Sequence, residues 1–146
     1  MPTARRSRLI AAPVGELWEV ISDPHHLPRW WPRVARVEDV DGAAFTEVMK
    51  TTRGKTVRAD FELADADEAA HTLRWEQRLD GTPFARLLSS ADTLVSLAEA
   101  GEATNVTIEL RQSLHGFMSR LGSVMVRRAA LATLEEALDG LERISG

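Results

Sequence analysis

The chain has 146 residues and a formal net charge of −4, and it contains neither cysteine nor tyrosine. This length allows a sizeable hydrophobic core, and we expect residues 1–146 to form a single domain. The absence of cysteine excludes a disulfide framework, a thiolate metal site and a cysteine nucleophile, and the absence of tyrosine excludes a phenolic acid.

Basic residues group only in "ARRSR" at 4–8 and "VRR" at 126–128. A surface that follows nucleic acid needs a longer basic stripe, so we expect no nucleic-acid partner. The apolar run at 9–14 is too short for an export signal. No window reaches the roughly 18 apolar residues that cross a bilayer. We therefore expect a cytoplasmic protein with no membrane span.

The first part of the chain predicts a strand and two short helices. Residues 5–11 suit a strand, and apolar side chains in residues 14–23 recur at helical spacing. Asp23 can cap a second short helix that begins at Pro24 and ends before Pro32.

Residues 33–114 change to a period of two, which predicts about six antiparallel strands. Turn signals, such as Asp41 followed by Gly42, separate these strands. One face of each strand is apolar, and the other carries charges of both signs, so we expect cross-strand ion pairs on a solvent face. The outward charged residues are Arg58, Asp60, Glu62, Arg74, Glu76, Arg78, Glu109 and Arg111.

Residues 117–144 return to helical spacing, and a helix over this range is about 42 Å long. The simplest way to bury every apolar face is an α+β fold in which a curved antiparallel sheet of six to seven strands wraps round this long C-terminal helix.

Four stretches are similar to those of a known group of proteins: "APVGELWEVISD" at 12–23, "WWP" at 30–32, "LRW" at 73–75 and "GEATNVTIEL" at 101–110. With the order of elements, they resemble the polyketide cyclase/dehydrase and lipid-transport superfamily, which includes steroidogenic-regulatory lipid-transfer domains and the birch-pollen allergen. The resemblance covers the whole chain and implies a helix-grip fold with a cavity between sheet and helix. Because members carry lipids, bind hormones or cyclise polyketides, the resemblance leaves the function open.

The inward parity of strands 71–79 and 104–114 places Gln77 and Gln112 among apolar side chains. A buried amide without a partner costs about 1–3 kcal/mol. The two amides therefore need each other, a water molecule or a ligand. Leu73, Trp75 and Leu110 share this inward parity and would form apolar walls of a small-molecule site.

The long helix contributes a further group of candidates. Leu121 and Met125 would add apolar walls, and Arg128 falls within the same apolar stripe. Two interpretations of Arg128 stay open. Its guanidinium group binds a counter-ion, water or an anionic group of a ligand, or its stem lies along apolar surface while the charge reaches solvent.

Candidates for catalysis are Glu47, whose direction the pattern of "AFTEVMK" leaves open, and His71, which has inward parity at a strand start. Either would act as acid or base, oriented by Arg128. His25 and His26 diverge by about 100° on a helix and lack a third ligand at a recognisable spacing, so we expect no metal and no cofactor.

The adjacent Trp30 and Trp31 also diverge, so we expect one in the core and the other near the cavity mouth. We expect the protein to bind a small, mostly apolar molecule that carries one polar or anionic group. One alternative is a polyketide cyclase/dehydrase-type enzyme that acts in the same cavity. A second is an interaction or co-chaperone-like module with a filled interior, and a homodimer is compatible with each.

Overall fold

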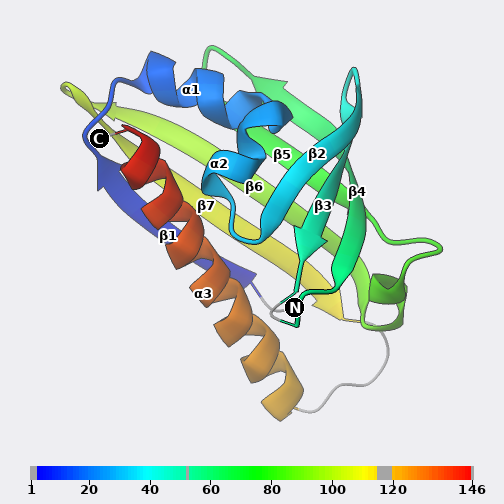
Figure 1. Ribbon diagram of the computed structural model, residues 1–146. Coiled ribbons are helices and arrows are strands. Elements are labelled where there is room, and N and C mark those ends of the chain that lie inside the picture. The colour runs from blue at the N-terminus through cyan, green and yellow to red at the C-terminus, as the bar shows by residue number, and fades with distance from the viewer. Residues whose placement is uncertain (1–2, 52, 115–119, 146) are drawn as a thin grey trace.

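The computed structural model describes residues 3–51, 53–114 and 120–145. It shows a curved sheet of seven antiparallel strands with the helices packed on one face (Figure 1), which confirms the predicted α+β fold class. The strands are β1 (Thr3–Ile10), β2 (Val34–Asp41), β3 (Ala44–Lys50), β4 (Thr56–Asp67), β5 (Thr72–Arg78), β6 (Leu88–Ala100) and β7 (Ala103–Leu114). The helices are α1 (Val14–Ser22), η1 (Pro24–His26), α2 (Leu27–Trp30), η2 (Pro83–Arg86) and α3 (Arg120–Ser145), where η marks a 3₁₀ helix.

The strands lie in the order β1-β7-β6-β5-β4-β3-β2, so β2 to β7 form a meander and β1 adds to its far edge beside β7. β4 is longer than the alternation predicts, because a register shift between Leu63 and Asp65 interrupts the period while pairing with β5 continues to Asp67. Residues 117–119 of the expected C-terminal helix lie outside the described residues.

The second short helix begins as expected. The Asp23 carboxylate accepts a hydrogen bond of 3.0 Å from the backbone N–H of His25, and Pro24 is the first residue of η1. The two tryptophans diverge as predicted: Trp30 is 2% exposed and belongs to the core, whereas Trp31 is half-buried. Their rings meet edge to face with centroids 5.4 Å apart.

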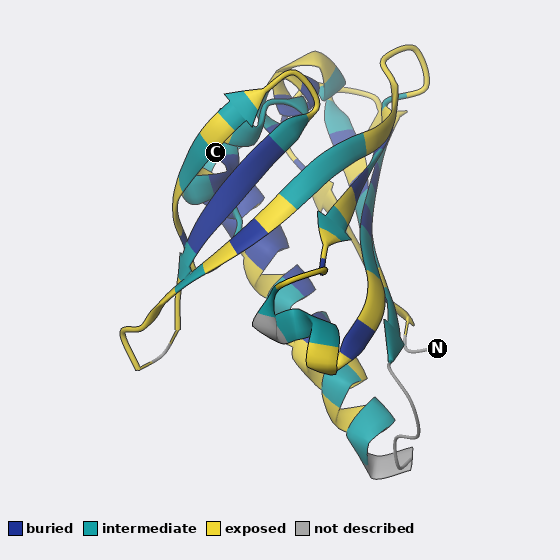
Figure 2. Ribbon diagram, turned by 90° about the vertical axis from the view of Figure 1, so that its right-hand side faces the viewer, coloured by how far each residue is buried: buried dark blue, intermediate teal, exposed yellow. Residues whose placement is uncertain are grey.

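Helix α3 buries its C-terminal half against the sheet and α2, through Ala130, Leu134, Ala137, Leu138 and Leu141. The predicted position of its apolar stripe is wrong for the N-terminal half. Figures 1 and 2 show these first turns extending beyond the sheet, where Val124 is 47% and Met125 is 64% exposed. Arg128 is exposed as well, so the interpretation in which its charge reaches solvent holds.

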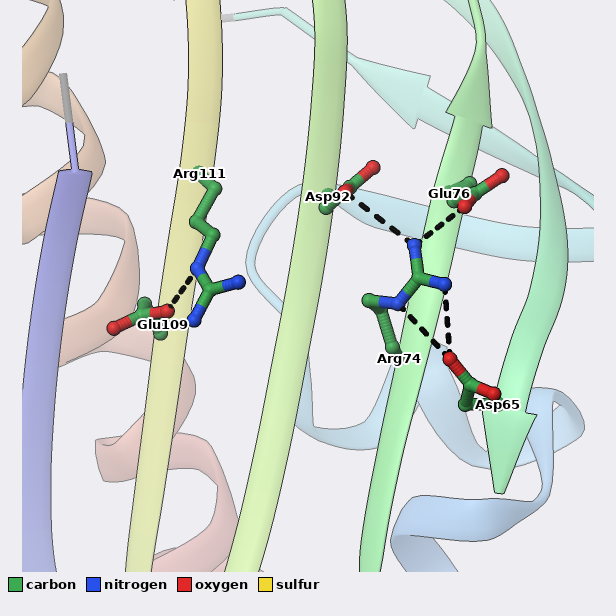
Figure 3. A network of polar contacts seen from close by, with 6 residues as sticks. All are labelled: Asp65, Arg74, Glu76, Asp92, Glu109 and Arg111. Atoms are coloured by element: carbon green, nitrogen blue, oxygen red, sulfur yellow. Dashed lines mark hydrogen bonds and ion pairs between the residues drawn. The ribbon is translucent and has the colours of Figure 1, made fainter. Parts of the chain in front are cut away.

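Charged pairs cover the outer face of the sheet, as expected (Figure 3). Arg74 contacts Asp65 on β4 at 2.9 Å and Asp92 on β6 at 3.5 Å, and it also contacts Glu76 on its own strand. Further pairs join Arg78 with Glu62, Arg58 and Arg36 with Glu38, and Arg111 with Glu109. Such exposed pairs contribute little to stability because water screens them, so they belong to a wet sheet surface.

The N-terminal basic cluster binds the C-terminal helix. Arg8 contacts Asp139 at 2.5 Å, Glu135 at 2.8 Å and Glu142 at 3.1 Å, and Arg6 contacts Glu135 at 3.2 Å. Edge strand β1 and helix α3 are therefore joined by charge as well as by apolar packing. Among the described residues, no helix has the length and apolar character needed to cross a membrane.

Helix α2 ends in close contact with α3 at Gly140. A Cβ atom built on Gly140 would lie 2.2 Å from the carbonyl oxygen of Trp30 and 2.8 Å from its Cα. Both are backbone atoms, which cannot move aside as a flexible side chain can. Only glycine at 140 lets α2 lie this close to α3 and bury Trp30.

We therefore expect Gly140→Ala to lower the free energy of unfolding by about 1–3 kcal/mol through overpacking, although alanine is intrinsically the better helix former by roughly 1 kcal/mol. Gly15→Ala in α1 is the matched control, because nothing lies within 4 Å of its built Cβ, and it should stabilise the protein slightly. Urea denaturation measures both variants. Equal stability changes in the two variants would contradict the close packing of α2 on α3.

Candidate functional site

A pocket of about 400 Å³ lies between α3 and strands β3 to β7. Its walls are mostly apolar and include Trp31, Met49, Phe61, Phe84, Leu110 and Val126. We call it the central pocket. A volume of about 300–1,000 Å³ with apolar walls and few polar groups is typical of small-molecule sites.

The side chains of α3 explain why this space is open. The helix residues that line the central pocket include Ala129, Ala130 and Thr133, which are small. Further along the same helix, Leu134 and Leu138 are buried and fill the corresponding space between helix and sheet. The pocket therefore lies where the sequence of α3 places small residues towards the sheet.

The structure brings together several of the residues that strand parity selected. Gln77, Gln112 and Leu110 line the central pocket. No hydrogen bond joins the two amides, although both residues are described. Trp75 is buried beside a small annex of about 30 Å³, which shares Trp31 and Glu47 with the central pocket.

Three other candidates do not line the pocket. Leu73 is buried in the core near the start of β5. Met125 and Arg128 are exposed, so the expectation that they face the cavity is wrong. Helix α3 instead lines the pocket with Val126, Ala129, Ala130 and Thr133. The side chain of Leu121 lies outside the described residues.

His71 is also absent from the central pocket, which corrects its expected role there. It occupies the turn before β5 with a positive φ of 55°, and its ring packs edge to face on Trp18 of α1 at 5.5 Å. The pocket residue Gln77 lies near the other end of the same strand. The His71 imidazole therefore packs on α1 and does not line the pocket or its annex.

Glu47 is the acidic group of the central pocket. It lies in the middle of β3, pairs with Val37 on β2 and Ala59 on β4, and is only 5% exposed. No described residue forms a hydrogen bond or an ion pair with its carboxyl group. Burial raises the pKa of Glu47 to about 8, so the group is mostly protonated at neutral pH.

The annex lies directly against this carboxyl group. Besides Glu47, its lining consists of Leu27, Trp31, Phe61, Trp75 and Thr93. A volume of about 30 Å³ is room for a water molecule or for one small group of a ligand. The Glu47 carboxyl group is therefore positioned to exchange a hydrogen bond with whatever occupies this end of the pocket.

The other groups of polar residues and the other hollow considered in the described structure are weaker candidates for a functional site. Within residues 3–51, 53–114 and 120–145, no three His, Asp or Glu side chains form a group that could hold a metal ion. His25 pairs through Nδ1 with Asp23 at 2.8 Å on an exposed turn. A hollow of about 430 Å³ beside Ile10 is bordered by Asp139, Glu142 and Arg143 of α3, which makes it a charged surface groove.

The raised pKa of Glu47 has a consequence for stability. The unfolded chain ionises this group near its ordinary pKa of 4.5, whereas the folded protein holds the proton up to about 8. Glu47 therefore does not reduce the free energy of unfolding below about pH 4.5, and it reduces this free energy increasingly as the pH rises towards 8. At about 1.36 kcal/mol per pKa unit, the loss reaches roughly 3 kcal/mol at pH 7.

We expect Glu47→Gln to remove this loss, because an amide of the same shape does not ionise. Its free energy of unfolding should exceed that of the wild type by roughly 3 kcal/mol at pH 7 and match it at about pH 4. Urea denaturation at the two pH values measures the difference, with Glu76→Gln on the outer face as control. A difference that does not vary with pH would show that Glu47 ionises normally in the folded protein.

Comparison with solved structures shows the same architecture in several proteins. A START superfamily protein from Mycobacterium smegmatis has a TM-score of 0.78 at 14% identity, covering 98% of this chain and 96% of that one. The di-domain ARO/CYC protein BexL, of the BE-7585A biosynthetic pathway, has a TM-score of 0.81 at 18% sequence identity. The match covers 98% of this chain and 46% of BexL. StfQ, a di-domain ARO/CYC protein of the steffimycin biosynthetic pathway, has a TM-score of 0.78 at 13% sequence identity. The match covers 99% of this chain and 50% of StfQ. At these identities the likeness shows the fold alone.

Comparison of sequences defines the family. No curated protein matches the sequence. The sequence model described as polyketide cyclase / dehydrase and lipid transport matches residues 1–146, which confirms the resemblance carried by the motifs. The chain therefore belongs to the polyketide cyclase / dehydrase and lipid transport family.

Proposed function

We propose that the protein binds a small, mostly apolar molecule in the central pocket. The observation that carries this proposal is a space of about 400 Å³ whose apolar walls are interrupted by a few inward polar side chains. Membership of a family described by lipid transport and polyketide cyclisation supports a ligand of this character. Interaction through a filled interior is the weaker alternative, because small residues of α3 leave room beside the sheet.

Gln77 and Gln112 would orient the polar end of the molecule. They lie on β5 and β7, on opposite sides of β6, and they do not bond to each other. Their amides offer both donors and acceptors inside an apolar enclosure. A ligand group that pairs with them would recover hydrogen bonds that the empty pocket leaves to water.

The first prediction from this proposal concerns Gln112→Leu, which keeps the apolar packing and removes one anchor. Loss of one hydrogen bond of about 0.5–1.5 kcal/mol should weaken binding by roughly threefold to tenfold without unfolding the protein. Native mass spectrometry of gently purified protein identifies the bound molecule. Quenching of Trp31 and Trp75, which border the pocket and its annex, then measures the affinity of each variant.

Arg128→Ala is the control, because this exposed side chain lies outside the pocket and its removal should leave binding unchanged. If Gln112→Leu binds the ligand with the affinity of the wild type, Gln112 does not anchor the ligand. A wild-type protein that carries no adduct and responds to no lipid or aromatic polyketide would remove the binding proposal itself.

A second candidate function is catalysis of the cyclase/dehydrase type in the same pocket. The observation that favours it is the unpartnered carboxyl group of Glu47, since a group with a pKa of about 8 both donates and accepts a proton near neutral pH. Removal of a proton next to a ketone carbonyl and protonation of a leaving hydroxyl are the steps that such a group performs in cyclisation and dehydration.

If the protein is such an enzyme, Glu47→Gln should lower kcat at least about a hundredfold while substrate binding is retained. An assay with an aromatic polyketide-like substrate, together with a separate binding measurement, distinguishes the two effects. Unchanged turnover in Glu47→Gln would exclude Glu47 as the acid–base group. His71→Ala serves as the control, because His71 packs on Trp18 outside the pocket.

A further inference from the structure

The charge inside the central pocket is unusual for a site expected to take an anionic ligand. None of the described residues that line the pocket or its annex is arginine, lysine or histidine. On α3, Arg127 is exposed and its Nε donates to the backbone carbonyl of Thr3 at 3.2 Å, and Arg128 is exposed as well. Of the two interpretations of Arg128, the pairing with an anionic group inside the cavity has no support, and the described interior contains no cation.

The described residues that surround Glu47 are uncharged. The elements packed against it contribute Val37 from β2, Leu27 from α2, Ala59 and Phe61 from β4, Trp75 from β5 and Thr93 from β6. The one other ionisable residue among the described lining is Asp92, and Figure 3 shows its carboxylate directed to Arg74 on the outer face. No described cation therefore holds Glu47 ionised, and its carboxyl group forms no hydrogen bond with Thr93 or with any other described side chain.

We propose that Glu47 determines which ligands the central pocket accepts: as a neutral carboxylic acid it donates a hydrogen bond to an uncharged oxygen, such as a ketone or quinone carbonyl, and the pocket rejects carboxylates and phosphates. This inference rests on the proposed binding function and names the class of ligand. The ligand is an apolar, in particular an aromatic, molecule with a carbonyl oxygen that reaches the annex.

The selection follows from desolvation. A carboxylate or phosphate that enters the pocket loses its water shell and meets no described cation in return, which is a large unfavourable term. A carbonyl oxygen loses far less hydration and gains a hydrogen bond from the acid. Because the donor must be present, binding of the carbonyl ligand weakens as the pH rises through the raised pKa of Glu47, about 8.

Three naphthalene derivatives of nearly equal size test the proposal: 2-acetylnaphthalene, 2-naphthoate and 2-naphthylmethylamine, with unsubstituted naphthalene as reference. Isothermal titration calorimetry of the wild-type protein at about pH 6.5 should show the ketone binding at least tenfold more tightly than the carboxylate. The affinity for the ketone should fall at least fivefold at about pH 9.5.

Three variants separate the donor from the charge. Glu47→Gln keeps a donor and should retain ketone binding while losing its pH dependence, and Glu47→Leu removes the donor and should weaken ketone binding at least fivefold. Glu76→Gln on the outer face should behave as the wild type, because its side chain pairs with Arg74 outside the pocket. Circular dichroism and thermal unfolding confirm that each variant is folded.

The outcomes are distinguishable. Equal binding of ketone and carboxylate, or ketone binding that ignores both pH and Glu47→Leu, overturns the inference and leaves the binding function in place. Tightest binding of the ammonium compound overturns it too, because Glu47 would then act as an ionised counter-ion. If no probe binds, unsubstituted naphthalene included, the proposed binding function fails and the inference fails with it.

Discussion

The spacing between α3 and the sheet controls both the stability of this fold and the position of its site. At Gly140 the helix lies against the backbone of Trp30, and from there Leu134, Leu138 and Leu141 fill the space above the strands. Towards its N-terminus the same helix presents Ala129, Ala130 and Thr133, which leave the space open. One helix thus anchors the fold at one end and leaves room for a ligand at the other.

The parts of the site that the sequence predicts come from strands whose alternation is undisturbed. In β5 and β7 every second residue faces inward, so a glutamine in an apolar row stands out and both Gln77 and Gln112 reach the pocket. The same alternation identifies the charged residues that face outward, and these form ion pairs on the solvent face of the sheet. A period of two is informative wherever one face of the sheet meets solvent and the other meets the core.

Prediction fails where that condition does not hold. In β3, residues 45–48 are all buried, which Figure 2 shows as an uninterrupted dark blue stretch, so no alternation reveals that Glu47 faces inward. On α3 the pocket is lined by Val126, Ala129 and Thr133, so a stripe drawn through the exposed Met125 places Arg128 on the wrong face of the helix. Both errors concern which residues are covered by other elements in the folded protein, and the spacing of residues in the sequence does not contain this information.

The position of Glu47 is difficult to explain by folding alone. Its carboxyl group bonds to no described residue, so it stabilises no turn, strand or interface, and burial makes it a source of instability above about pH 4.5. A leucine at this place would not ionise and would avoid that cost. Groups that destabilise a fold and face a pocket are typical of functional sites, where the benefit lies in what they bind. The proposed role of Glu47 in ligand recognition would explain why an unpaired carboxyl group lines an apolar pocket.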